Sequence, residues 1–306
     1  MHLTPGGAPD WCPDPRVLKV TVGGHCVQKE SKSPTPHGSR RYLICLDLLC
    51  LCIVSLPFLI CELGLVAPVK RGFFCDDSTI QYPLIREETI SDTVLISVGI
   101  LITGVTIVLG ECYRVSRQNS SKSHPREGYL AAVYCQLLPF LFGSALGQSL
   151  TNTAKLSAGR LRPNFLSVCQ PEGLNCTAGY VETYHCTGDV AAVTEARKSF
   201  YSGHASFSMY SMLYLTFYLQ VRFTWQGARL LRPLVQFVLI LLALFTGFTR
   251  ISDYRHHPTD VLVGFLQGAL VAYCVVFYIS DLFRKKKSLY ISVPPRPESP
   301  ETFTNC

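Results

Sequence analysis

Charged residues are scarce in this chain: 16% of its 306 residues are Asp, Glu, Lys or Arg, whereas soluble domains carry about 25%. Hydrophobic residues make up 48%, and the mean hydropathy is +0.24. This composition excludes an ordinary soluble domain and indicates a membrane protein. The net charge of +7 comes from Lys and Arg beside apolar runs, where such residues orient a membrane protein rather than bind nucleic acid.

Motifs for metal and nucleotide chemistry are also absent. The 14 cysteines include no Cys-x-x-Cys pair of the zinc-binding kind, and the sequence has no Gly-rich Walker loop. No apolar run lies close to Met1, so we expect no cleavable signal peptide. Four cysteines in polar connections are candidates for disulfides, and the sequence leaves their pairing open: Cys75, Cys169, Cys176 and Cys186.

Long apolar runs are what the chain does contain. Six of them are long enough to cross a hydrocarbon core of ~30 Å as helices. They cover residues 42–67, 89–113, 129–153, 205–221, 233–248 and 261–283. The sequence therefore predicts an all-α fold, a six-transmembrane helical bundle. We expect one catalytic domain over residues 41–284, between a disordered tail, 1–40, and a second tail, 285–306.

Basic residues gather in alternate connections. The connections 114–126 and 222–232, and the segment that follows the last run, are rich in Lys and Arg, so the positive-inside rule makes them cytoplasmic together with both termini. The connections 68–88, 154–204 and 249–260 are then exoplasmic or lumenal. Asn175 starts a glycosylation sequon in the long exoplasmic connection, so we expect it to carry a glycan.

The connection 249–260 holds Arg250, His256 and Asp260 between two apolar runs. Arg250 can bind an anion, and the imidazole of His256 can attack or carry protons near neutral pH. Asp260 follows His256 by four residues, a spacing that puts both side chains on one face of a helix. We therefore expect Asp260 to orient His256.

Basic residues begin the connection 154–204. Lys155 and Arg162 are seven residues apart, so they share one helix face if the third helix continues to Pro163. Together they would clamp an anion. The alternative is that both side chains only extend to the membrane interface at the end of a span.

The same connection ends with Ser202, Gly203 and His204, at the start of the fourth run. Gly203 allows close backbone approach, and N–H groups at a helix start attract an anion. His204 is placed there to give or take a proton. The alternative is that Ser202 only caps the helix and His204 is an interfacial residue.

The predicted topology brings these three clusters to one membrane face. Three cations and helix N-terminal amides suit the oxygens of a phosphate, whose transfer depends mostly on positioning and charge stabilisation. His256 can attack phosphorus, and His204 can protonate the departing alkoxide and then activate water. The sequence therefore predicts hydrolysis of a phosphomonoester without metal or cofactor.

These motifs resemble the type 2 phosphatidic acid phosphatase superfamily. The first motif, Lys-x6-Arg-Pro, begins at Lys155, Ser-Gly-His ends at His204, and Arg-x5-His-x3-Asp begins at Arg250. Tyr201 and the segments 71–75 and 159–165 look like the animal lipid phosphate phosphatase (phospholipid phosphatase) branch. The resemblance covers roughly residues 40–285.

The resemblance implies a six-span, metal-independent phosphatase with an exoplasmic active site. Its substrates would be phosphatidate, lysophosphatidate, sphingosine 1-phosphate and ceramide 1-phosphate in the outer or lumenal leaflet. It implies that His256 is the nucleophile, His204 the acid and Asp260 the group that orients His256. The phosphate would be held by the remaining motif residues: Lys155, Arg162, Ser202, Gly203 and Arg250. The protein would be a multi-pass protein of the plasma membrane and endomembranes.

Two positions depart from the family pattern. Thr249 stands where the family usually has Ser, which keeps the hydroxyl, and Pro258 stands where the close branch usually has a bulky aromatic residue. Two other functions stay open: a lipid phosphotransferase that passes phosphate to another alcohol, and a transporter or scaffold that binds an anion without turnover. The sequence leaves open the preferred lipid and the exact compartment, and it allows a homo-oligomer.

Overall fold

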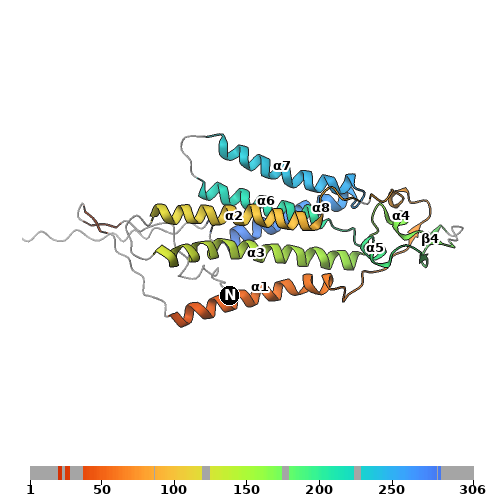
Figure 1. Ribbon diagram of the computed structural model, residues 1–306, viewed down its shortest axis with the longest axis horizontal. Coiled ribbons are helices and arrows are strands. Elements are labelled where there is room, and N and C mark those ends of the chain that lie inside the picture. The colour runs from red at the N-terminus through yellow and green to blue at the C-terminus, as the bar shows by residue number, and fades with distance from the viewer. Residues whose placement is uncertain are drawn as a thin grey trace, which may run out of the picture.

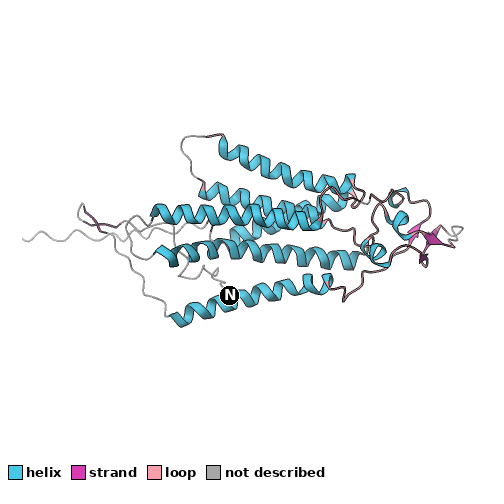
Figure 2. Cartoon of the chain, viewed as in Figure 1, coloured by secondary structure: helices cyan, strands magenta, loops and turns pink. Residues whose placement is uncertain are grey.

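Long helices dominate the computed structural model, which describes residues 20–22, 25–27, 37–85, 87–118, 125–173, 179–223, 229–280 and 282–283. They run side by side, with short helices and strands at one end of the bundle (Figures 1 and 2). The prediction of a predominantly helical fold is confirmed. The long helices are α1 (His37–Glu62), α2 (Asp92–Gln118), α3 (Pro125–Ala158), α6 (Gly203–Arg222), α7 (Leu231–Ser252) and α8 (Pro258–Cys274).

Five helices in the described part of the chain are long and apolar enough to cross a membrane. They are α1, α2, α3, α7, and α8 together with its π-helical continuation η3 (Val275–Ile279). The chain is therefore that of a multi-pass membrane protein. The run at 205–221, predicted as a further span, forms α6, which is not among these five.

α6 differs from the other long helices because it lies inside the bundle. It packs against α2, α3, α7 and α8, and its polar side chains find partners there. The hydroxyl of Tyr210 donates to the carbonyl of Phe140 at 2.7 Å, and that of Tyr214 donates to the carbonyl of Gln136 at 3.0 Å. A helix rich in Ser and Tyr is stable at this place because its buried Ser and Tyr hydroxyls have acceptors.

Glycines on α8 let this helix approach α6 closely. A Cβ added to Gly264 would lie 2.6 Å from the carbonyl oxygen of Ser202, and one added to Gly268 would lie 2.2 Å from that of Ser206. Small residues at a helix contact allow such short backbone distances. The first turns of α6 and α8 are thereby held next to each other.

A small cap of short helices and strands lies at the end of the bundle where α3 ends. It contains β3 (Phe73–Phe74), η1 (Ser78–Ile80), α4 (Phe165–Cys169), β4 (Pro171–Glu172), β5 (Tyr180–Val181), β6 (His185–Cys186) and α5 (Val190–Glu195). Strand β3 pairs antiparallel with β5, and β4 pairs antiparallel with β6. Buried apolar side chains around Phe73 and Phe165 form its core.

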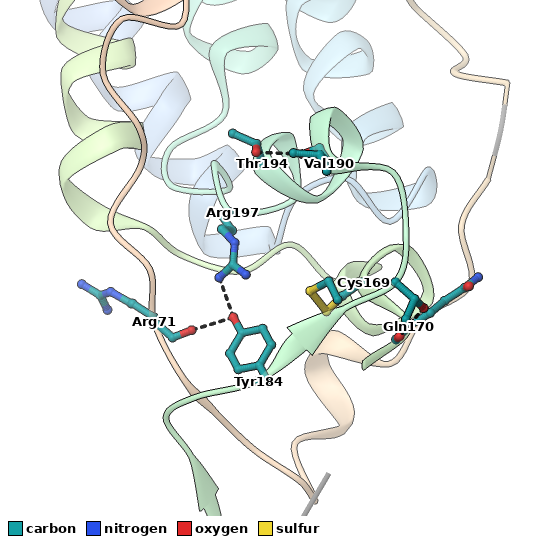
Figure 3. Close-up of a disulfide and its surroundings, with 9 residues drawn as sticks. Arg71, Cys169, Gln170, Tyr184, Val190, Thr194 and Arg197 are labelled. Carbon is teal, nitrogen blue, oxygen red and sulfur yellow. Dashed lines mark hydrogen bonds between the residues drawn. A yellow bond between two sulfur atoms is a disulfide. The ribbon is translucent and has the colours of Figure 1, made fainter. Parts of the chain in front are cut away.

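A disulfide between Cys169 and Cys186 ties α4 to β6 (Figure 3). Beside it, Arg197 donates to the hydroxyl of Tyr184, which itself donates to the carbonyl of Arg71 at 2.9 Å. These contacts fix the segment that runs from α5 to the start of α6. Of the cysteines considered for disulfides, Cys176 lies outside the described residues.

Several predictions fall on parts of the chain that the structure does not describe. The sequon at Asn175 is one, and the C-terminal tail over residues 285–306 is another. Most of the N-terminal tail over residues 1–40 is a third. Within that tail, β1 (Val20–Val22) and β2 (His25–Val27) pair antiparallel, and α1 already begins at His37.

Candidate active site

The residues singled out from the sequence lie at helix ends on the same side of the bundle, next to the cap. Lys155 is in the last turn of α3, His204 in the first turn of α6, and Arg250 in the last turn of α7. His256 lies in the turn between α7 and α8, and Asp260 is in the first turn of α8. Separate parts of the chain are thus brought to one end of the bundle.

His256 is held by a backbone carbonyl. Its Nδ1 lies 2.7 Å from the carbonyl oxygen of Ser199, and because a carbonyl only accepts, Nδ1 carries the proton. Nε2 is then the unprotonated, nucleophilic nitrogen. Burial, followed by the nearby cations Arg162 and Lys155, lowers the pKa of His256 well below its usual value. The imidazole is therefore neutral at physiological pH.

Asp260 does not contact His256 in the way its spacing suggests. The distance from His256 Nδ1 to Asp260 Oδ2 is 4.0 Å. The helical spacing does not apply because α8 begins at Pro258, so that His256 precedes the helix. Asp260 instead accepts from the hydroxyl of Ser199 at 2.6 Å and from Arg160 at 2.5 Å. Asp260 thus holds the residue that holds His256.

His257 is the N-cap residue of α8. Its backbone N–H and its ring Nδ1 lie 3.2 and 3.3 Å from Asp260 Oδ2, which is a capping-box arrangement. Its ring therefore faces the start of the helix, and its role is structural.

Arg250 is almost completely buried, with 1% of its surface exposed. Its Nη2 donates to Asp253 at 2.9 Å, and its Nη1 donates to Glu88 at 3.0 Å. Its Nη1 also lies 3.3 Å from His204 Nε2. The hydroxyl of Thr249 lies 3.4 Å from Nε of Arg250, so Thr supplies the hydroxyl that the family pattern expects there.

His204 lies between the cation of Arg250 and the chain that leads into α2. Its Nε2 is 3.0 Å from the carbonyl oxygen of Ile90, and its Nδ1 is 3.4 Å from Asp92 Oδ1. The ring is 7% exposed. An imidazole in this position can exchange a proton with a group bound against Arg250.

Lys155 and Arg162 do not both lie on α3: Lys155 is in its last turn, whereas Arg162 is in the loop that follows. α3 ends at Ala158 and the chain turns at Gly159, which has a positive φ of 56° and would bring a Cβ to 2.2 Å from the carbonyl oxygen of Val69. Arg162 is therefore not on the helix face of Lys155, because the condition for a shared face, a third helix that continues to Pro163, is not met.

Glu195 is paired with Arg162 and lies within the electrostatic influence of Lys155. Arg162 Nη2 donates to Glu195 Oε1 at 2.5 Å. Burial raises the pKa of Glu195, but Arg162 and Lys155 outweigh this effect and hold the pKa below its usual value. The carboxylate is thus charged and balances the charge of these basic side chains.

The start of α6 lies over Lys155. Ser202 is the N-cap residue, and its hydroxyl accepts from the N–H of Ala205 at 3.4 Å. A Cβ added to Gly203 would lie 3.5 Å from Lys155 Nζ, so the start of α6 is next to the ammonium. A helix N-terminus next to a cation is a favourable place for an anion.

Comparison with known proteins identifies the family that this arrangement belongs to. The PAP2 superfamily profile matches residues 136–284, which contain every residue discussed as catalytic or phosphate-binding. Phospholipid phosphatase 2 of Homo sapiens is 51% identical over 251 residues, 81% of this chain and 86% of that protein. The chain belongs to the phospholipid phosphatase family of the PAP2 superfamily.

Other members of the phospholipid phosphatase family match to a similar extent. Phospholipid phosphatase 2 of Mus musculus is 49% identical over 261 residues, 84% of this chain and 91% of the relative. Phospholipid phosphatase 1 of Rattus norvegicus is 44% identical over 251 residues, 80% of this chain and 87% of the relative. No solved structure matches the chain significantly. The family predicted from the motifs is confirmed, and with it the enzyme class, a lipid phosphatase.

Several residues of this phospholipid phosphatase site were not found from the sequence. They touch the motif residues directly but come from other segments: Glu88, Arg160, Glu195 and Ser199. Arg160 at least lies inside the segment 159–165 that carries the resemblance. Among the described residues, no group of three or more His, Cys, Asp or Glu side chains is placed to hold a metal ion.

Proposed function

We propose that the chain hydrolyses the phosphomonoester of membrane lipids through a phosphohistidine on His256, without a metal ion. The substrates are phosphatidate, lysophosphatidate, sphingosine 1-phosphate and ceramide 1-phosphate. The observation that carries this proposal is the contact of His256 Nδ1 with the carbonyl oxygen of Ser199 at 2.7 Å. It fixes the tautomer in which Nε2 keeps its lone pair for attack on phosphorus.

In the first step, His256 Nε2 forms a bond to phosphorus while the bond from phosphorus to the lipid oxygen breaks. His204, which takes up a proton as the phosphate dianion binds beside it, gives that proton to the departing lipid alkoxide. Three cations and two hydrogen-bond donors stabilise the phosphoryl oxygens: Lys155, Arg162, Arg250, the hydroxyl of Ser202 and the N–H of Gly203. This arrangement fits a reaction that depends on positioning and charge stabilisation.

In the second step, water attacks phosphorus and the bond to His256 Nε2 breaks. His204, left neutral by the first step, accepts a proton from that water. Inorganic phosphate leaves, and both histidines return to their starting state. Asp260 accepts a hydrogen bond from the hydroxyl of Ser199 at 2.6 Å. Through Ser199 it keeps the imidazole of His256 in the same orientation during both steps.

We also infer a six-span topology in which α6 is the remaining span. It runs alongside its neighbours in Figure 1, and its 20 residues are enough to cross a hydrocarbon core of ~30 Å. The active site is then exoplasmic, because the basic connections 114–126 and 222–232 join the opposite helix ends and are cytoplasmic. Both termini are cytoplasmic, Asn175 carries a glycan, and the protein resides in the plasma membrane and in endomembranes.

The test is phosphate release from phosphatidate by the purified full-length chain in EDTA. We expect turnover in EDTA, loss of turnover in His256→Ala, and full turnover in His185→Ala, which alters an exposed histidine of the cap. Brief reaction with radiolabelled phosphatidate, followed by an alkaline quench, should leave acid-labile label on the wild-type chain. Turnover by His256→Ala at the wild-type rate would refute the assignment of the nucleophile, and loss of turnover in EDTA would refute metal independence.

A further inference from the structure

Glu88 lies in the segment before α2 and has no part in the steps above. Its Oε2 accepts from Arg250 Nη1 at 3.0 Å, and its Oε1 accepts from Arg255 Nη2 at 3.1 Å. The side chain of Glu88 is 28% exposed, whereas that of Arg250 is 1% exposed. A solvent-accessible carboxylate thus reaches in to a buried guanidinium.

The two carboxylates on Arg250 differ in how they are held. Asp253, 5% exposed, accepts from Nη2 of Arg250 and also from the N–H and hydroxyl of Thr89 at 3.0 and 2.8 Å. Asp253 is therefore a fixed partner that orients the guanidinium. Glu88 has only the two arginines as partners among the contacts of the described residues.

The edge of Arg250 that Glu88 occupies is the one beside the proposed acid. Nη1 of Arg250 lies 3.3 Å from His204 Nε2, and a phosphate that reaches both groups has to use this nitrogen. The same His204 Nε2 lies 3.0 Å from the carbonyl oxygen of Ile90. The segment from Glu88 to Ile90 thus presents oxygen atoms to both groups that the substrate has to reach.

We propose that Glu88 is a resident counter-ion that occupies the phosphate position on Arg250 and is displaced when substrate phosphate arrives. This inference rests on the proposed function. Asp253 occupies Nη2 of Arg250, and a buried donor without an acceptor is unfavourable, so the carboxylate of Glu88 satisfies Nη1 while the site is empty. Carboxylate and phosphate oxygens accept from a guanidinium in the same geometry. Arg255 offers Glu88 a partner after displacement, and return of the carboxylate favours release of the phosphate product.

The test is inhibition by inorganic phosphate of phosphatidate turnover by the purified full-length chain. Glu88→Gln should lower the inhibition constant of phosphate about five- to tenfold, the scale of one partly exposed ion pair, and KM should fall while kcat does not rise. A Glu88 that only positions Arg250 predicts the opposite sign, because its loss would weaken phosphate binding. An unchanged or higher inhibition constant in Glu88→Gln overturns the proposal.

Glu87→Gln is the matched control, since it makes the same chemical change at an exposed neighbouring residue and should leave the inhibition constant unchanged. If Glu88→Gln does not fold, Glu88→Asp replaces it, because the shorter side chain withdraws from Arg250 and should lower the inhibition constant by a smaller factor. The proposed function fails separately, when His256→Ala keeps turnover or phosphate does not inhibit the wild-type chain.

Discussion

Asp260→Asn tests whether Asp260 acts on His256 through Ser199. One carboxylate oxygen of Asp260 accepts from Arg160 at 2.5 Å, and the other accepts from the hydroxyl of Ser199 at 2.6 Å. An amide offers one acceptor oxygen, and its NH2 group would face one of these donors. The substitution keeps the volume of the side chain and removes its charge, so Ser199 loses its fixed position below His256.

The expected loss follows from these contacts. Hydrogen bonds to a charged group contribute about 1.5–3 kcal/mol each, and every 1.36 kcal/mol is a factor of ten in rate. Loss of one such contact should reduce kcat about 10- to 150-fold. A carboxylate bonded directly to a catalytic imidazole has a larger effect, about 10⁴-fold in serine proteases. The 4.0 Å between His256 Nδ1 and Asp260 Oδ2 predicts the smaller value.

The assay is kcat for phosphatidate in Asp260→Asn, in Ser199→Ala and in the double variant. Both single substitutions break the same link, so the double variant should lose about as much as either one. Asp189→Asn, an exposed carboxylate that caps α5, should leave kcat unchanged. A loss near 10⁴-fold in Asp260→Asn, or multiplying effects in the double variant, would refute the indirect connection.

Three further predictions concern stability. Burial and neighbouring cations lower the pKa of His256. Below pH ~6.5 the unfolded chain therefore binds a proton that the folded chain does not. The free energy of unfolding should then fall by up to about 1.4 kcal/mol for each pH unit below that value. His256→Asn should show a shallower decline in chemical unfolding across pH 5–7, and equal slopes would contradict this assignment. Gly268→Ala would place a Cβ 2.2 Å from a backbone oxygen of α6, and it should lower the free energy of unfolding by about 1–3 kcal/mol, measured by thermal unfolding. The control is Gly147→Ala, because the nearest neighbour of its added Cβ is 3.8 Å away. It should change the stability little. Cys186→Ser removes the disulfide to Cys169 across a separation of 17 residues and should cost about 3 kcal/mol, and a thermal midpoint unaffected by this change would show that the cap is stable without the disulfide.

Much of the bundle and the motif residues of the site could be predicted from the sequence. Long apolar runs set the helices, and Arg250, His204 and His256 are conspicuous because charge and imidazole are rare beside such runs. The family follows from the order and spacing of these motifs. Local patterns carry this information, since each depends on residues a few positions apart.

Contacts between distant segments could not be predicted in this way. The helix does not reach Arg162 because the chain makes a left-handed turn at Gly159. Glycine adopts many backbone conformations, so its presence in the sequence does not reveal which one occurs. The hydrogen-bond partner of His256 is a backbone carbonyl, which any residue type supplies. The identity of Ser199 therefore does not predict this contact. Glu88 reaches Arg250 from 162 positions away.

The polarity of α6 has a consequence for how the chain enters the bilayer during synthesis. Three of its tyrosine hydroxyls find acceptors on helices made before it: Tyr210 and Tyr214 bond to α3, and Tyr218 bonds to Glu111 of α2. Alone in lipid, these groups would be unsatisfied. With α6 as the proposed sixth span, we expect its integration by the translocation machinery to depend on α2 and α3 being already in place, because a fragment that starts after α3 would lack these acceptors.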